Sequence, residues 1–384
     1  MPRPLRRACL RALAAVALTL VAACAPAAAP PPAPTTAPAV QPAPPTAAPS
    51  AVAAAPTAAP VTPAARKAVK LGTVPTIASA PVIIAQERGY FGQEGLDIEA
   101  VNFQVGSEAV APLASSQLDA AVGFSPSAGL LNAIARNVST KIVASNGSLR
   151  PNRNLGGFVV RKDLEQPSGY VELVSLPRPV RAATGAGGLL PHALLLLEAE
   201  RAGLGEADLD VTFVRSLPDV NAALRNNAVD LGTSGEPLIT IGEQQGILAR
   251  WKPLSDLYPD LPFSTLLYGP GLLERERDAG QRLMRAYLRG ARDYADAFGR
   301  GQSPDEIVGL LSGPLNTPPP LFDALQERGG LVYLDPNGAR SLDPLRPVID
   351  VWTRTGALQP GFDLAALADL SFADTAVGQL GRYQ

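Results

Sequence analysis

Segments typical of β-strands alternate with segments typical of helices in two successive series, and this order is the strongest constraint on the fold. The strand-like segments of the first series are 69–74, 96–103, 120–124 and 141–145. Those of the second series are 180–184, 209–214, 230–233 and 247–253. Strands that alternate with helices predict an α/β fold with parallel sheets.

The two series share a short pattern as well as an order. Asp119 and Asp230 each stand beside a buried-type strand, and Pro126 and Pro237 each follow in the next turn. Both pairs are separated by 111 positions (230 minus 119, and 237 minus 126). This spacing predicts two similar α/β lobes in tandem. The alternative is that any two α/β units share such spacing.

Two facing lobes predict a ligand cleft between them. Open α/β sheets bind ligands at the carboxyl ends of their strands, and here both sets of ends would face one cleft. Closure of the lobes about a hinge would bury the ligand. Gly157–Arg161 and Phe263–Gly269 are the segments that we expect to form this hinge.

The first 24 residues are typical of an export signal with a lipid attachment site. Four arginines between Arg3 and Arg11 precede the apolar run Ala12–Ala23, and Cys24 follows. This pattern resembles a bacterial lipobox and predicts a signal peptide at 1–23 with lipidation of Cys24. The alternative is a transmembrane anchor, but the apolar run is shorter than the roughly 20 residues needed to cross a membrane.

Residues 24–66 consist almost entirely of alanine, proline and threonine. Such a segment cannot bury a core, and its prolines favour extended chain. We therefore predict a disordered linker that holds the folded part away from the membrane. The alternative is a disordered segment without any spacing role.

Composition limits the chemistry of the remaining chain. Cys9 would be removed with the signal, so no disulfide is expected, and His192 is the only histidine. A zinc site of ordinary ligands is therefore not expected. The formal net charge of −2 and the absence of a basic cluster beyond the signal argue against nucleic acid as a partner. No cofactor is predicted.

Four segments carry a family resemblance: Pro81–Phe91, Glu94–Glu99, Gln117–Asp119 and Lys141–Ala144. They resemble the solute-binding proteins of ABC importers, in the family of sulfonate-, nitrate- and thiamine-precursor-binding proteins (SsuA/NMT1-like). The resemblance implies a two-lobed type II periplasmic-binding fold with a hinge and a central cleft. It also implies an extracytoplasmic protein, without enzyme activity, whose partners are a small-molecule ligand, an ABC permease and its ATPase.

The predicted division of the folded part follows from this resemblance. Lobe 1 would begin with 67–160, lobe 2 would be 161–262, and 263–384 would return to lobe 1 with C-terminal helices. Ser168–Pro179 departs from the family pattern, and this weakens the transfer of site residues to lobe 2.

Five residues of lobe 1 are candidates for the ligand site because they lie where a strand ends and a helix begins. Free backbone N–H groups and hydroxyls at such turns can hold a ligand acceptor. The candidates are Thr76, Ser79, Phe124, Ser125 and Ser127. The alternatives are helix capping for the serines and core packing for Phe124.

In lobe 2, a glycine-rich turn before a helix supplies further candidates. The candidates in this turn are Thr184, Gly187 and Gly188, and its glycines would let the backbone approach a ligand at the helix N-terminus. His192 lies one turn into the same helix and is a candidate as well, although a lone histidine on an apolar helix is more often a packed or surface residue.

Glu236 is the candidate that bears on ligand identity, because the resemblance places an acidic or polar residue before a proline, facing the ligand. A carboxylate there would repel a purely anionic ligand unless an arginine or lysine compensates. Together with Phe124 it favours a planar nitrogen-containing ligand, such as a thiamine-related pyrimidine or a flavin. Alkanesulfonate, taurine or nitrate is the alternative within the fold, and a surface glutamate is the alternative for Glu236 itself.

Two functions of other classes remain open on the sequence. One is an enzyme similar to the precursor synthases of thiamine metabolism, whose cysteine cluster this chain lacks. The other is a ligand sensor that signals through a separate partner.

Overall fold

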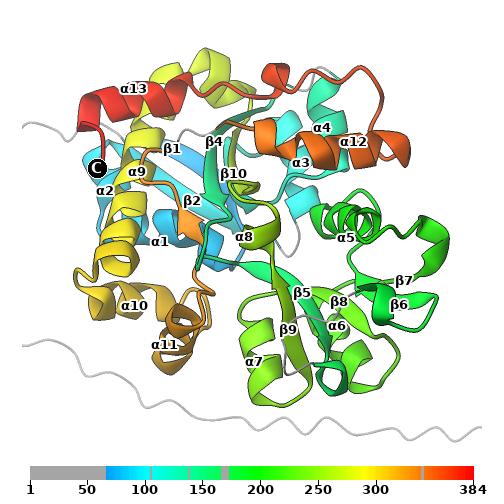
Figure 1. Cartoon of the computed structure of the whole chain (residues 1–384). Helices are drawn as coiled ribbons and strands as arrows, with labels where there is room; N and C mark the ends of the chain where they lie inside the picture. The colour runs from blue at the N-terminus through cyan, green and yellow to red at the C-terminus, as the bar shows by residue number, and fades with distance from the viewer. Residues whose placement is uncertain (1–65, 104–105, 137–138, 166–172, 339–340) are drawn as a thin grey trace, which may run out of the picture. The chain divides into compact units, whose positions relative to one another are not determined.

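A computed structural model describes residues 66–384 except 104–105, 137–138, 166–172 and 339–340 (Figure 1). The predicted signal peptide, Cys24 and almost all of the linker lie outside the described residues. The folded part belongs to one compact unit, Thr62–Gln384. The lobe boundaries therefore remain a prediction, and the fold is described below by its two sheets.

The first sheet has six strands in the order β11-β4-β10-β3-β1-β2. Its strands are β1 (Lys67–Thr73), β2 (Leu96–Asn102), β3 (Ala120–Phe124), β4 (Lys141–Ser148), β10 (Pro262–Tyr268) and β11 (Tyr333–Leu334). The second sheet has five strands in the order β7-β6-β8-β5-β9. Its strands are β5 (Gly156–Arg161), β6 (Val180–Thr184), β7 (Leu209–Phe213), β8 (Leu231–Gly235) and β9 (Leu248–Pro253). All strands of the second predicted series lie in the second sheet.

The two sheets have equivalent strand orders. Strands β2-β1-β3-β10-β4 of the first sheet correspond to β7-β6-β8-β5-β9 of the second, with the same parallel and antiparallel neighbours. Strands β3 and β8 are 111 positions apart at both ends (231 minus 120, and 235 minus 124). The spacing found in the sequence therefore reflects a structural repeat.

Each sheet contains parallel neighbours, as predicted, and also an antiparallel strand that the alternation of strands and helices did not predict. Strand β10 runs antiparallel between β3 and β4, and β5 runs antiparallel between β8 and β9. These two strands contain nearly all of the predicted hinge segments, so the backbone of those segments is paired within sheets. The chain passes from one sheet to the other just before them, through 149–155 and 254–261 (Figure 1).

Helices pack against both sheets. Their bounds are α1 (Ala80–Glu87), α2 (Tyr90–Gln93), α3 (Val110–Ala114), α4 (Ala128–Ala135), α5 (Leu190–Arg201), α6 (Leu217–Arg225), α7 (Leu238–Gln244), α8 (Leu254–Leu257), α9 (Arg277–Arg300), α10 (Pro304–Ser312), α11 (Pro319–Glu327), α12 (Arg346–Arg354) and α13 (Ser371–Leu380). Shorter turns of 3-10 helix are η1 (Ile77–Ser79), η2 (Gly106–Ala109), η3 (Lys162–Leu164), η4 (Leu173–Ser175), η5 (Glu206–Asp208), η7 (Asp343–Leu345) and η8 (Ala365–Leu367), and η6 (Gly271–Arg275) is a π-helix.

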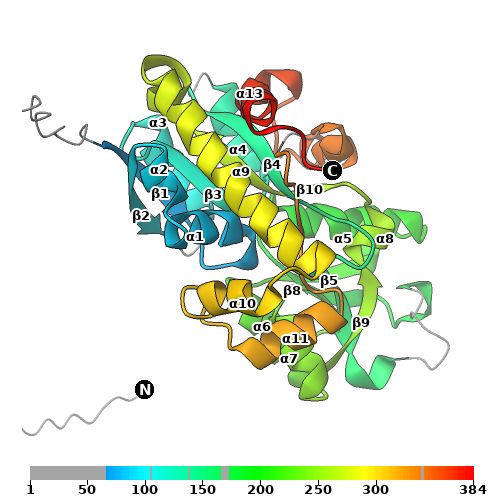
Figure 2. The ribbon, with the colours of Figure 1, turned by 90° about the vertical axis from the view of Figure 1, so that its left-hand side faces the viewer.

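Helix α9 is the central helix of the layer that covers the first sheet, because it contacts α1, α2, α10 and α13 (Figure 2). Its apolar stripe, including Leu283, Met284, Tyr287 and Leu288, is buried, while its arginines lie on the opposite side. Helix α12 instead packs against α5, so the C-terminal part of the chain also contacts the second sheet's layer. No helix in the described part of the chain is long and apolar enough to cross a membrane.

The contact between α9 and α1 gives a test of this packing. A Cβ atom at Gly290 would lie 2.1 Å from the carbonyl oxygen of Pro81, whereas one at Gly299 of the same helix meets nothing within 4 Å. We expect Gly290→Ala to lower the free energy of unfolding by about 1–3 kcal/mol through overpacking. Gly299→Ala should raise it by about 0.5–1 kcal/mol, because alanine is the better helix former. Urea denaturation of both variants measures the difference, and equal effects would contradict the packing.

Candidate functional site

A cavity of about 230 Å³ lies where the two sheets meet. Its walls come from the carboxyl ends of β3 and β8, from the start of β5 and β10, and from the first turns of α5 and α6. The apolar lining residues are Ala78, Leu155, Pro191, Leu194, Leu217, Leu254 and Phe263. The polar ones are Thr76, Ser125, Thr233, Ser234, Glu236 and Ser264, and Gly123, Gly157 and Gly235 complete the lining.

The cavity lies at positions that the repeat relates to one another. Gly123 and Ser125 at the end of β3 correspond to Ser234 and Glu236 at the end of β8, each 111 positions later (234 minus 123, and 236 minus 125). Both sheets therefore present the same pair of positions to the cavity. At Gly123 the φ angle is +89° and a Cβ atom would lie 2.7 Å from the Ser79 hydroxyl, so this wall requires glycine.

Three predicted site residues line the cavity: Thr76, Ser125 and Glu236. Thr76 stands at the turn between β1 and η1. The Ser125 hydroxyl donates a hydrogen bond of 2.8 Å to the carbonyl oxygen of Phe263 and thereby links β10 to the turn after β3.

The other three candidates of the first sheet lie outside the cavity lining. The buried Ser79 hydroxyl donates to the carbonyl oxygen of Val74 at 2.8 Å, so it closes its own turn. Phe124 is buried against Phe103, with the rings edge to face and their centroids 6.3 Å apart. The Ser127 hydroxyl accepts a bond from the backbone N–H of Leu130 and caps α4. For Ser127 and Phe124 the structure shows the alternatives considered, helix capping and core packing, whereas the Ser79 side chain makes no capping hydrogen bond to α1.

The four remaining candidates, near α5, also lie outside the lining. The Thr184 hydroxyl pairs with that of Thr233 at 2.8 Å, and both side chains are buried. Gly187 is exposed, and a Cβ atom there would meet nothing within 4 Å. His192 packs edge to face on Phe213, 5.1 Å between ring centroids, and burial lowers the pKa of its imidazole below the ordinary value.

Gly188 takes part in a contact between the two predicted ligand turns. Its carbonyl oxygen accepts a 2.8 Å bond from the backbone N–H of Ala128, and Ser127 forms a β-bridge with Leu189. The turn after β3 and the turn before α5 were predicted to face a ligand from opposite sides. The two turns contact each other directly at these residues, which explains why Ser127 and Gly188 do not line the cavity, although Ser125 of the first turn does.

Glu236 is neutralised within the protein. Its side chain is 1% exposed, and Oε1 lies 2.5 Å from Nη2 of Arg250, in the geometry of a close ion pair and not of an aligned hydrogen bond. Its Oε2 accepts a bond of 3.1 Å from the backbone N–H of Thr240. Arg250 therefore supplies the compensating positive charge, a possibility that the sequence analysis left open.

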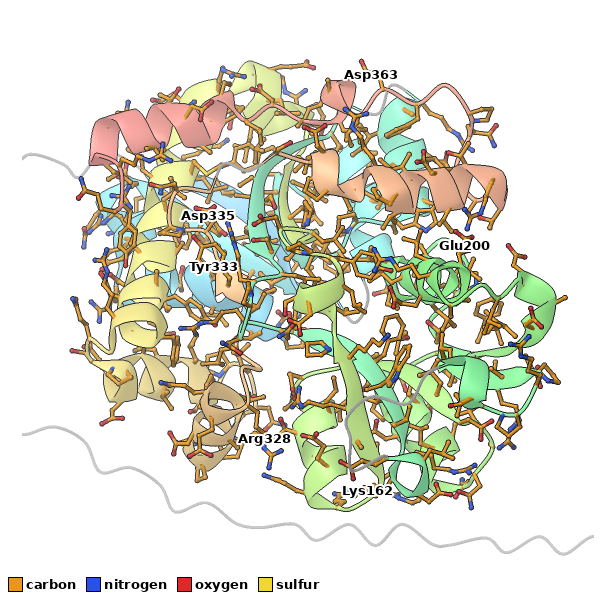
Figure 3. All side chains as sticks on the ribbon, viewed as in Figure 1. Lys162, Glu200, Arg328, Tyr333, Asp335 and Asp363 are labelled. Atoms are coloured by element: carbon orange, nitrogen blue, oxygen red, sulfur yellow. The ribbon has the colours of Figure 1, made fainter. Side chains whose placement is uncertain are left out.

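Two further ion pairs extend this group toward α11. Arg250 donates through Nε to Oε2 of Glu243 at 3.1 Å, and Arg328 donates to the same oxygen at 2.9 Å. Arg328 comes from the loop after α11 and reaches toward α7 (Figure 3). Gly330 in that loop packs on Glu236, since a Cβ atom there would lie 3.0 Å from its Cγ.

Sequence reasoning missed most of the lining. Leu194 and Pro191 face the cavity from α5, whereas the adjacent His192 does not, and Phe263 and Ser264 were assigned to a hinge. Ser234 could have been found, because the turn Ser234–Pro237 corresponds in the repeat to the turn that contains Ser125. The hydroxyls of Ser234 and Ser264 are buried and make no hydrogen bond within the described residues.

Among the described residues, no group of three or more His, Cys, Asp or Glu side chains could hold a metal ion. The polar groups around the cavity are instead hydroxyls and one paired carboxylate. This arrangement suits the enclosure of a small molecule.

The sequence matches the model of the NMT1-like family over residues 62–303. The chain belongs to the NMT1-like family. None of the curated proteins compared matches it by sequence.

Solved structures share its fold. The periplasmic aliphatic sulphonate binding protein SsuA from Escherichia coli is 18% identical and has a TM-score of 0.63, over 79% of this chain and 92% of that one. The periplasmic nitrate-binding protein NrtA from Synechocystis PCC 6803 is 16% identical and has a TM-score of 0.64, over 82% and 89%. The desulfurization enzyme DSZB is 18% identical, with a TM-score of 0.59 over 82% and 100%. The predicted periplasmic-binding-protein fold is confirmed.

The ion pair of Glu236 and Arg250 predicts a marked effect on stability. Arg250→Met should lower the free energy of unfolding by about 3–5 kcal/mol, because it leaves a buried carboxylate without its partner. The double variant Glu236→Gln with Arg250→Met should recover most of this loss. Denaturant unfolding of the single and double variants measures the coupling. Arg346→Met, which removes an exposed pair with Asp343, is the control and should change stability by less than about 1 kcal/mol.

Proposed function

We propose that this chain is the solute-binding component of an ABC importer, which captures a small organic solute between its two sheets and delivers it to a permease. The observation that carries the proposal is the cavity, walled by equivalent strand ends from both sheets. Membership of the NMT1-like family and the likeness to SsuA and NrtA support it.

The cavity bears on which solute is bound. Its volume of about 230 Å³ is below the range of roughly 300–1,000 Å³ typical of pockets for drug-sized ligands. This size disfavours a flavin and suits a small molecule such as a single pyrimidine. The two residues that favoured a nitrogen heterocycle no longer do so, because Phe124 is in the core and Glu236 has its own cation.

Binding is favoured over catalysis by the lining. One relative in fold is an enzyme, DSZB. The cavity of this chain offers hydroxyls and a carboxylate that is already paired, and these groups hold a solute more readily than they activate one. A sensor that uses the same cavity would differ only in its partner.

A membrane anchor completes the proposal. The arginine-rich start, the apolar run and Cys24 support export and lipidation, and the following Ala/Pro/Thr-rich segment would tether the folded part outside the cytoplasm.

Solute binding is tested by thermal denaturation of the purified full chain with pyrimidines, thiamine, riboflavin, taurine, alkanesulfonates, nitrate and amino acids. A ligand at 100 times its Kd adds about 2.7 kcal/mol to the free energy of unfolding. We expect at least one small organic solute to raise the melting temperature. The matched control is Leu194→Trp, which fills the cavity and should abolish the shift. A shift that persists in this variant would place the solute elsewhere, and no shift with any solute would count against the proposed function.

The anchor is tested by lipid labelling in a bacterial host. We expect labelled palmitate to be incorporated into the wild-type chain and to be lost in Cys24→Ser, because the thioether linkage needs that thiol. Cys9→Ser is the control and should keep the label. Equal labelling of wild type and Cys24→Ser would refute the lipoprotein assignment.

A further inference from the structure

We infer that the cavity is built for an uncharged ligand, because the charge of its one ionisable lining residue is cancelled from outside the cavity. That residue, within the described lining, is Glu236. The inference rests on the proposed function and names the class of its ligand. It assigns Glu236 and Arg250 the role of a specificity-determining pair.

Both oxygens of Glu236 are already engaged by the protein. Oε1 is paired with Arg250 at 2.5 Å, and Oε2 accepts the backbone N–H of Thr240 at 3.1 Å. The carboxylate therefore needs no donor from a ligand. Glu236 is part of the lining and Arg250 is not, so an anionic ligand gains no direct cation.

Arg250 is held away from the cavity by further contacts. It donates to Oε2 of Glu243 at 3.1 Å and to the hydroxyl of Thr240 at 3.0 Å. Arg328 approaches the same Glu243 oxygen at 2.9 Å. The four ionised side chains thus contain two acids and two bases, and the group carries no net charge.

An apolar cavity of this kind penalises charge on the ligand. A charged group that leaves water needs an opposite charge and hydrogen bonds to offset its loss of solvation. The side chains facing the cavity are largely aliphatic, and their other polar groups are the hydroxyls of threonine and serine. Hydroxyls can satisfy a carbonyl, an amide or an alcohol, but they supply no net charge. The site is therefore matched to a small apolar molecule with an uncharged polar group.

The test compares ligands that share a shape but are neutral, negative or positive. Benzamide, benzoate and benzamidinium form one series, and butyramide, butyrate and butyramidinium form a second, smaller one. Calorimetry and thermal denaturation of the full chain compare the three members of each series. We expect the amide to bind at least about tenfold more tightly than either charged member in one series or both.

Variants of the pair give an independent readout. Glu236→Gln leaves the charge of Arg250 less compensated, so the ratio of carboxylate to amide affinity should rise by about tenfold or more. Adding Arg250→Gln to this variant should restore the preference for the amide. Arg346→Gln, in an exposed pair with Asp343, is the control and should leave the ranking unchanged.

The outcomes separate this inference from the proposed function. Tighter binding of a carboxylate or an amidinium by the wild-type chain overturns the inference and supports solute binding. An unchanged ranking in Glu236→Gln overturns the role of the pair. If no member of either series binds, the inferred ligand class is wrong. The broader solute screen alone decides whether the chain binds solutes.

Discussion

The exchange of antiparallel strands between the two sheets is the constraint on which the rest of the structure depends. Strand β5 enters the second sheet directly after β4 of the first, and β10 enters the first sheet directly after β9 of the second. Each pairs with a strand, β8 or β3, whose end forms a wall of the cavity. The hydrogen bonds between these strands therefore fix the positions of the crossing segments relative to the cavity walls. A site between the sheets is a direct consequence of this connectivity.

The polar groups of the cavity are arranged so that charge stays inside the protein. Burial of a lone carboxylate costs several kcal/mol, and the ion pair with Arg250 offsets that cost for Glu236. The contact of Arg328 with Glu243 and the packing of Gly330 on Glu236 connect the same group to the segment after α11. The charged group beside the site is thereby connected to α7 and to the segment after α11.

The relatives in fold show why architecture and ligand must be argued separately. SsuA and NrtA are named for a sulphonate and for nitrate, yet both share this fold at identities of 18% and 16%. A fold is maintained by burial patterns that many sequences satisfy, whereas ligand choice rests on a few side chains at strand ends. In this chain the equivalent strand ends carry Gly123, Ser125, Ser234 and Glu236, which line the cavity.

The sequence by itself determined the order of strands and helices, the repeat and the family, because hydrophobic periodicity and spacing are local properties of the chain. It also named Thr76, Ser125 and Glu236, three residues that line the cavity. Only the tertiary structure decided that Arg250 neutralises Glu236. It also decided that Ser127 and Gly188 lie in a contact between two turns, and that the strands β5 and β10 belong to sheets. The reason is physical: hydrogen-bond partners, ion pairs and the direction of a side chain such as His192 depend on segments distant in sequence. Local pattern carries no record of those contacts.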